Sequence, residues 1–381
     1  MGDGPAMVAL VAHRFAAGQP TGIGRYYREL AVALAEGADP ARRRHVAVST
    51  REPSTGPWAP PSLEVVQVPG DRRWRALGWA LTGRPPVDRF LGDVDLVHLL
   101  HPWTVVPTRA PLVVTVHDLM VLQHPRWYGR AEAWMHRRGL RQAVAHAARF
   151  VVNSEHTGRE LVDELGVERE RVRVAHLGVG EEFRRRPAPA EVAAVCTRLR
   201  VEPGRFVVAV GAVSERKNLG TVLRALAALD PAVRPILVAA GPRGVGADGI
   251  VATAERLGVA EDVRWAGFVG HEDLTALLTA SAALVHPSRA EGFGMTPLEA
   301  MAAGVPALVS DVGSVREVTG DAAVLLDPDD ADAWAAALES MLTDPDRRAA
   351  LVAAGTAHQA PFTWRRCADE TAAVHDEVLA R

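Results

Sequence analysis

Lysine is almost absent from this 381-residue chain, because Lys217 is the single lysine among 43 basic residues. Cysteine is scarce too, and Cys196 and Cys367 are too few for a disulfide framework. The start, MGDGPAMVALVAHRF, lacks the basic segment and long apolar stretch of a secretory signal. No apolar run approaches the ~18 to 20 residues of a membrane-spanning helix. We therefore expect a cytoplasmic protein, with any membrane contact peripheral and on the inner face.

Charge is nearly balanced overall but unevenly distributed. The net charge is -3, yet residues 1–185 carry 25 Arg against 20 Asp and Glu (+5), and the remainder carries 18 basic against 26 acidic residues (-8). Neither part has the dense basic stripe of a nucleic-acid-binding protein, so we expect no nucleic-acid partner. The mildly positive first half suits an anionic ligand or a membrane surface.

The length and the 48% hydrophobic content predict two domains of ordinary size. Short apolar runs alternate with segments of helical spacing, which indicates two α/β domains with parallel, Rossmann-like sheets. A segment at 181–203, rich in Arg and Pro, interrupts the alternation and is interpreted as an interdomain linker with a helix. We expect a first domain over 1–184, a second over 185–361, and an amphipathic helix over 362–381 that packs back on the first. The expected strands are 7–12, 45–49, 63–68, 95–100, 111–116, 149–153, 171–175, 205–211, 234–241, 262–267, 282–288 and 305–310.

The richest chemical pattern is SRAEGFGMTPLEAMAAGVPALVSDVGS, residues 288–314, in which Glu291 and Glu299 lie eight positions apart. Pro297 fits the first turn of a helix, so both glutamates fall near its positive end. Free backbone N–H groups there suit a diphosphate, and carboxylates accept hydrogen bonds from sugar hydroxyls. A pair of solvated glutamates favoured by the helix dipole is the structural alternative.

A second pattern is GAVSERKNLGTVLRAL, in which a strand ends at Gly211 and the cations Arg216 and Lys217 precede a helix that begins near Asn218. Such a pair can stabilise the negative charge that grows on a leaving diphosphate. An ordinary exposed turn is the structural alternative. The lone lysine, in a chain that otherwise uses arginine, suggests a site that rejects guanidinium.

These motifs resemble the retaining glycosyltransferases of family GT4, which have the GT-B fold of two facing Rossmann-like domains with an interdomain cleft. The resemblance runs over almost the whole chain. It implies that Glu291 faces the donor sugar and Glu299 the ribose, with Arg216 and Lys217 on the diphosphate. Further donor contacts are implied for Gly211, Phe293, Gly294, Met295 and Thr296, and for backbone near Val269 at the base.

The resemblance also implies two sites in the first domain. Gly22 and Gly24 stand between a strand and a helix, where they would close over the donor phosphates, although a G-x-G alone is more often a tight turn. His117 ends an apolar strand and would contact the donor sugar, as in similar enzymes, whereas a lone strand-end histidine is more often structural. The Asp93-Val94-Asp95 segment imitates a metal-binding motif, but Asp95 leads into an apolar strand; we expect no metal and no cofactor.

The predicted function is transfer of a hexose or deoxyhexose from a nucleoside diphosphate to a hydroxyl acceptor, with retention. The pattern HDL…HP from His117 to Pro125 looks most like bacterial mannosyltransferases, which makes GDP-mannose the first donor, with dTDP- or UDP-sugars behind it. A glycan, a lipid-linked sugar and a small molecule remain open as acceptors. A nucleotide-sugar epimerase of the same architecture and a non-catalytic sugar-binding protein are the alternatives. Residues 71–84, with arginines around Trp74, are a candidate for membrane contact.

Overall fold

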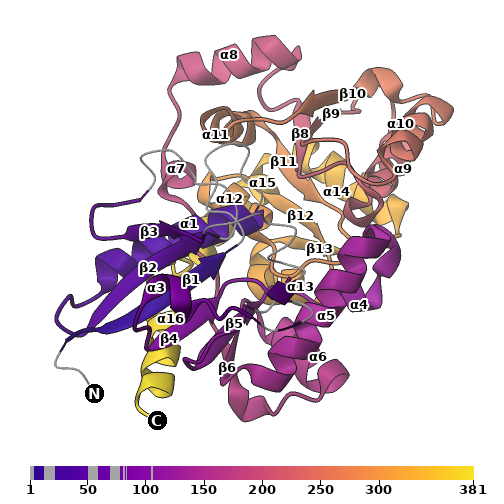
Figure 1. Ribbon diagram of the computed structural model, residues 1–381. Helices are drawn as coiled ribbons and strands as arrows, with labels where there is room; N and C mark the ends of the chain where they lie inside the picture. Colours follow the sequence, from indigo (N-terminus) through magenta and orange to yellow (C-terminus); the bar gives the residue numbers. More distant parts are fainter. Residues whose placement is uncertain are drawn as a thin grey trace. The chain divides into compact units, whose positions relative to one another are not determined.

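The computed structural model describes residues 4–12, 22–49, 59–68, 78–79, 82, 84–103 and 106–381. The chain forms two compact units, one from Met1–Gly178 with Phe362–Arg381 and the other from Val179–Pro361. Each unit is built on one parallel β-sheet flanked by helices (Figure 1). Among the helices that the structure describes, none is long and apolar enough to cross a membrane.

The first unit contains seven described strands in the order β3-β2-β1-β4-β5-β6-β7, all parallel. β4 and β5 are buried along their whole length, which explains why their sequences are continuous apolar runs rather than alternating ones. The strands are β1 (Ala6–Ala12), β2 (Arg43–Ser49), β3 (Glu64–Gln67), β4 (Leu96–Leu99), β5 (Leu112–Val116), β6 (Arg149–Val152) and β7 (Val172–Val174). The described helices are α1 (Gly22–Gly37), α3 (Asp88–Leu91), α4 (Met120–Gln123), α5 (Arg130–His146), α6 (Glu155–Leu165) and α16 (Trp364–Leu379).

The C-terminal helix α16 belongs to this first unit, although the second unit separates it in sequence from the rest. Figure 1 shows it in yellow beside the indigo β-strands, and it packs against α1. Its buried face includes Trp364, Val374 and Val378. Glu377 forms ion pairs with Arg149 at 3.2 Å and Arg173 at 2.9 Å. Apolar packing and ion pairs together therefore attach α16 to the sheet.

The second unit contains six described strands in the order β10-β9-β8-β11-β12-β13, again parallel. They are β8 (Phe206–Val210), β9 (Ile236–Ala240), β10 (Val263–Gly267), β11 (Ala283–His286), β12 (Ala307–Ser310) and β13 (Val324–Leu326). The helices are α7 (Glu181–Arg184), α8 (Pro189–Leu199), α9 (Leu219–Ala228), α10 (Ala247–Arg256), α11 (His271–Ala280), α12 (Met295–Ala302), α13 (Gly313–Thr319), α14 (Ala331–Thr343) and α15 (Pro345–Gln359).

The division between the units falls after Gly178, earlier than the boundary after residue 184 expected from the sequence. The reason is α7: Phe183 is fully buried, and this helix packs on α11 and α12 of the second unit. Thr275 adds a hydrogen bond from its hydroxyl to the carbonyl of Glu182. The segment interpreted as an interdomain linker therefore begins inside the second unit.

Candidate active site

The order of strands in the second unit reverses between β8 and β11, and ligands of open α/β sheets bind at such a point. The loops that leave these two strands line a small recess that includes Gly211, Lys217, His286 and Ser288. Gly211 has φ of +125°, and a Cβ there would lie 3.0 Å from Cε of Lys217. Glycine is therefore required at this strand end, both for its backbone conformation and for the room that Lys217 takes.

Three charged side chains converge at this place. Nζ of Lys217 donates to Oε1 of Glu291 at 2.7 Å, and the Arg216 guanidinium lies 2.9 Å from the same oxygen. Arg216 also donates to the carbonyl of Ala290 at 3.0 Å. The cation pair and the first glutamate of the spaced pair, which lie 74 positions apart, therefore form one cluster.

This cluster is held away from water, since the side chains of Lys217 and Glu291 are 14% and 12% exposed. Burial alone would raise the pKa of Glu291, but the charges of Lys217 and Arg216 lower this pKa well below its ordinary value. For Lys217, burial lowers the pKa, while Glu291 and Glu299 act in the opposite direction. The site thus combines an ionised carboxylate with two cations in a setting that strengthens electrostatic interactions.

His286, at the end of β11, completes the cluster, with Nε2 3.3 Å from Oε1 of Glu291. Burial and then the charge of Lys217 lower its pKa, so the ring is neutral at pH 7. The hydroxyl of Ser314 donates to the carbonyl of Glu291. Neither residue was among the sequence candidates, although the position of His286 at the carboxyl end of an apolar strand is a usable signal.

The segment from Phe293 to Glu299 forms the turn and first helical residues that the sequence predicted. Gly294 precedes α12 with φ of +110°, a conformation that favours glycine. Met295 and Thr296 open the helix and are half-buried, whereas Phe293 is 4% and Glu299 6% exposed. The glutamates therefore do occupy the loop before the helix and its second turn.

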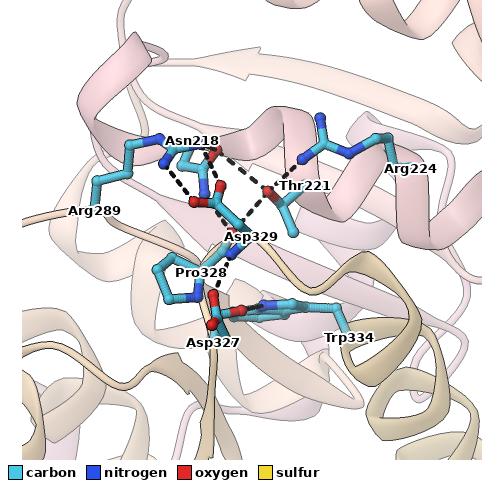
Figure 2. A network of polar contacts seen from close by, with 8 residues as sticks. All are labelled: Asn218, Thr221, Arg224, Arg289, Asp327, Pro328, Asp329 and Trp334. Carbon is cyan, nitrogen blue, oxygen red and sulfur yellow. Dashed lines mark hydrogen bonds and ion pairs between the residues drawn. The ribbon is translucent and has the colours of Figure 1, made fainter.

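A second polar network fixes the loops that carry these charges (Figure 2). Asn218, with φ of +50°, donates to the carbonyl of Pro328 at 2.7 Å. Arg289 donates to Asn218 at 3.3 Å and to Asp329 at 2.9 Å. Arg289 and Asn218 are neighbours in sequence of Glu291 and Lys217 respectively. This network therefore ties three loops at the carboxyl edge of the sheet, and the sequence patterns had not indicated it.

Val269 lies at the same edge, in the loop between β10 and α11. Gly267 has φ of +65° at the end of β10, and Phe268 is 45% exposed. Since β10 is the edge strand, this loop stands two strands away from Gly211. The proposed role of Val269 at the base is a backbone contact, made from this loop at the carboxyl edge of the sheet.

In the first unit, His117 directly follows β5 and is 7% exposed. Its Nε2 lies 3.0 Å from the carbonyl oxygen of Leu100, and burial lowers its pKa to about 4. The ring is therefore neutral at pH 7 and donates to that carbonyl. It also packs edge-on against Tyr26, with ring centroids 4.6 Å apart.

An aromatic cluster adjoins His117 at the carboxyl ends of β4 and β5. His101 stacks on His117 at 5.8 Å and meets His136 of α5 at 5.0 Å. Trp103 and Tyr128 lie 5.2 and 6.0 Å from His136. All four cluster residues, His101, Trp103, Tyr128 and His136, are half-buried, so each keeps an accessible edge.

Gly22 and Gly24 fall within the first turn of α1 rather than in a loop before it. A Cβ on Gly22 would meet no described atom within 4 Å, so the fold of the described chain does not demand glycine there. The residues just before Gly22, as well as Trp74 and most of the 71–84 candidate for membrane contact, lie outside the described residues.

Comparison with known proteins identifies the family. Residues 198–358 match the family described as Glycosyl transferases group 1, and residues 20–183 match Glycosyltransferase Family 4. An O-antigen chain mannosyltransferase B of Escherichia coli is 30% identical over 262 residues, which are 68% of each chain. The chain belongs to the group 1, family 4 glycosyltransferases. This glycosyltransferase is also 33% identical over 299 residues to a D-inositol 3-phosphate glycosyltransferase of Nocardia farcinica, covering 73% of this chain and 65% of that one.

Solved structures agree on the fold. An Anabaena protein, Alr3699/HepE, crystallised with UDP and glucose, has a TM-score of 0.77 at 18% identity and covers 98% of this chain and 100% of its own. WaaG, a glycosyltransferase involved in lipopolysaccharide biosynthesis, has a TM-score of 0.73 at 20% identity, with 96% and 99% covered. The predictions of a GT-B fold, of family GT4 and of a transferase are therefore confirmed.

Proposed function

We propose that this glycosyltransferase moves a hexose or deoxyhexose from a nucleoside diphosphate sugar to a hydroxyl acceptor, with retention at the anomeric carbon. Mannose is the first sugar to test. The product would belong to a glycan, a glycolipid or a natural product. The observation that carries the proposal is the convergence of Arg216, Lys217 and Glu291 where the strand order reverses.

The cations have a defined part in this reaction. Negative charge grows on the diphosphate as the glycosidic bond breaks, and fixed cations that are shielded from water stabilise it without reorganisation. The Lys217 ammonium has three N–H donors, so it can hold Glu291 and a diphosphate oxygen together. Because Arg216 and Lys217 supply this positive charge, we propose that transfer needs no metal ion, and turnover in excess EDTA tests this.

The glutamates are suited to the sugar side of the donor. Glu291, ionised through its pKa shift, would accept hydrogen bonds from hydroxyls of the hexose, and Glu299 from the ribose. Phe293, Gly294, Met295 and Thr296 would offer backbone N–H groups at the start of α12. Gly211 and backbone near Val269 would complete the donor site.

His117 is suited to contact the donor sugar and not to transfer a proton. Its pKa of about 4 keeps the ring neutral, and its Nε2–H is engaged by Leu100. In a retaining reaction by same-face attack, the leaving phosphate accepts the proton of the acceptor hydroxyl, so no protein base is required. The half-buried rings of His101, Trp103, Tyr128 and His136 would stack on the acceptor.

The donor proposal rests on relatives and on the HDL…HP pattern. The E. coli relative is named a mannosyltransferase, which supports GDP-mannose first. The HepE structures contain UDP or UDP-glucose, so UDP-sugars and dTDP-sugars stand next. A glycan, a lipid-linked sugar and a small molecule are the acceptor classes to screen.

A thermal-shift panel of GDP, UDP, dTDP and ADP with their sugar conjugates tests the donor site. A ligand at 100 times its dissociation constant stabilises the fold by about 2.7 kcal/mol, which shifts Tm by a few degrees. We expect one diphosphate to shift the wild type and to fail with Lys217→Ala and Glu299→Ala. Binding of no nucleotide at all would overturn the proposal, and the anomeric configuration of the product, read by NMR, tests retention separately.

A further inference from the structure

The outer face of α5 carries a concentrated positive charge. The helix contains four arginines and one acidic residue, Glu132, in a chain whose net charge is -3. Arg130, Trp134, Arg137 and Arg141 are spaced by four, three and four residues, so they share one side of the helix. Glu132 lies about 200° around the helix from Arg130. The arginine stripe is therefore not neutralised from within its own helix.

The opposite face of α5 explains why this stripe points outward. Ala133, Gly139, Leu140 and Ala143 are buried against the unit. A Cβ on Gly139 would lie 1.7 Å from the carbonyl oxygen of Pro102, so the helix is pressed onto the loop after β4. Packing thus fixes the rotation of α5, and the stripe is presented as a rigid surface.

An exposed tryptophan stands in the middle of the stripe. Trp134 is 55% exposed, and the guanidinium of Arg138 lies 5.9 Å from its ring centroid. Together with Arg130, Arg137 and Arg141 it lines an open hollow of about 600 Å³. Tryptophan among arginines on one helical face is the composition of helices that lie in the headgroup region of anionic bilayers.

The length of the stripe favours a bilayer over a single small anion as its ligand. Arg130 and Arg141 are eleven residues apart, which is ~17 Å along the helix axis. The stripe thus spans several lipid headgroups but is much longer than one phosphate group.

We propose that the stripe of Arg130, Trp134, Arg137 and Arg141, with Arg138 beside Trp134, docks this glycosyltransferase on an anionic lipid bilayer, and that its acceptor is carried on a lipid. The lipid-carried acceptor rests on the proposed function. Helix α5 links the docking surface to the acceptor site, because it also contributes His136 to the aromatic cluster beside His117. A bilayer on one face of α5 therefore brings the head of a lipid-anchored sugar toward rings on the other face.

Co-sedimentation of the full chain with vesicles tests the docking. We expect binding to vesicles that contain phosphatidylglycerol, none to phosphatidylcholine alone, and release by high salt. Removing two arginines weakens the attraction by about 30-fold, at ~1 kcal/mol each, so Arg137→Glu with Arg141→Glu should lose at least that much. The matched control, Arg205→Glu with Arg256→Glu, changes the same charge on exposed sites of the second unit and should bind like wild type.

Two outcomes would overturn the docking surface: no binding of the wild type to anionic vesicles, or a stripe variant that binds these vesicles as tightly as the control variant does. Binding to an acidic polysaccharide but not to vesicles would also overturn it. An unchanged Tm and an unchanged diphosphate-induced shift in the stripe variant show that the fold and donor site are intact. The vesicle result therefore tests the docking surface independently of the donor proposal.

A second measurement tests the lipid-carried acceptor. The stripe variant should have a higher KM than wild type for a vesicle-embedded acceptor and the same KM for its water-soluble analogue. Equal changes in the two KM values would contradict a lipid carrier.

Discussion

Lys217 is an ammonium in a protein that otherwise uses guanidinium. The recess gives a physical reason, since Cε of Lys217 would lie 3.0 Å from a Cβ at position 211 and the side chain is almost enclosed. A planar guanidinium is larger and needs a different set of partners. The size of the site, and not charge alone, therefore selects lysine here.

We expect Lys217→Ala to lower kcat/KM by ~10²- to 10³-fold, the loss seen when one donor to a developing charge is removed. Lys217→Arg keeps the charge and should still lose activity, because the guanidinium does not fit beside Gly211. Steady-state kinetics with the donor identified by thermal shift measure both. Wild-type activity in Lys217→Arg would show that enclosure does not explain the lone lysine.

Asp329 pairs with Arg289, which lies two residues before Glu291. Its side chain is 59% exposed, so the ion pair adds at most ~1 kcal/mol to stability. The same pair orients the loop that carries Glu291, and through Asn218 the loop that carries Lys217. Its effect should therefore appear in activity far more than in stability.

Asp329→Ala should raise KM for the donor ~10-fold or more, as expected for a small misplacement of binding groups, with a Tm change near that of a neutral surface substitution. Asp248→Ala is the matched control, because it breaks another exposed arginine pair of the second unit, with Arg243. Donor KM and Tm are measured side by side. An equal KM for the donor in the two variants would contradict a positioning role for Asp329.

At the scale of elements, the loop after β4 and helix α5 are in direct contact at Gly139. Any side chain there collides with the backbone of Pro102 and Trp103. Since His101 and Trp103 in this loop meet His136 of the helix, the close approach also assembles the aromatic cluster.

Gly139→Ala should therefore destabilise the protein by ~1 to 3 kcal/mol, the usual cost of overpacking. Gly129→Ala is the control, because Gly129 precedes the same helix and a Cβ there meets no described atom within 4 Å. Urea unfolding compares the two variants. A Gly139→Ala protein as stable as the control would mean that the helix can move away without cost.

For the whole molecule, α16 buries a set of histidines against the first sheet. Nε2 of His375 lies 3.0 Å from Nδ1 of His98, whose other nitrogen meets Thr115 at 2.8 Å. Burial, the largest cause, lowers the pKa of His45 to about 4 and of His98 to about 3, and the pKa of His375 also falls well below its ordinary value. The folded state thus holds these rings neutral.

Stability should accordingly fall in mild acid. An unfolded histidine has a pKa of ~6.5, so between pH 6.5 and about 4 the unfolded chain binds more protons than the folded one, and stability declines as pH falls through this window. For His45 alone the loss between pH 7 and 5 is about 2 kcal/mol. Urea unfolding at both pH values, with wild type and His45→Gln, checks this; His45→Gln should reduce the pH dependence, and an unchanged dependence would contradict the role of His45.

Much of this architecture was predictable because its signals are local. Apolar runs between helical segments predicted every strand that the structure describes except β13, which is short and only half-buried at each of its three residues. The helix α12 was predicted from Pro297, and α16 from its apolar side. The boundary of the units was placed too late, because the burial of Phe183 depends on α11 and α12, which no local pattern around residue 183 can reveal.

The sequence by itself determined the alternation of strands and helices, the position of Lys217 and Glu291 in the segments between a strand and the next helix, and the family, because periodicity and motif spacing lie within short segments. Only the tertiary structure decided that one oxygen of Glu291, Oε1, contacts Lys217, Arg216 and His286. It also decided that Asp329 pairs with Arg289 beside this cluster, and that the arginines of α5 lie opposite its buried face. These facts depend on contacts between residues that are far apart in the chain, and such contacts form only when parallel strands bring their carboxyl ends to one edge of a sheet.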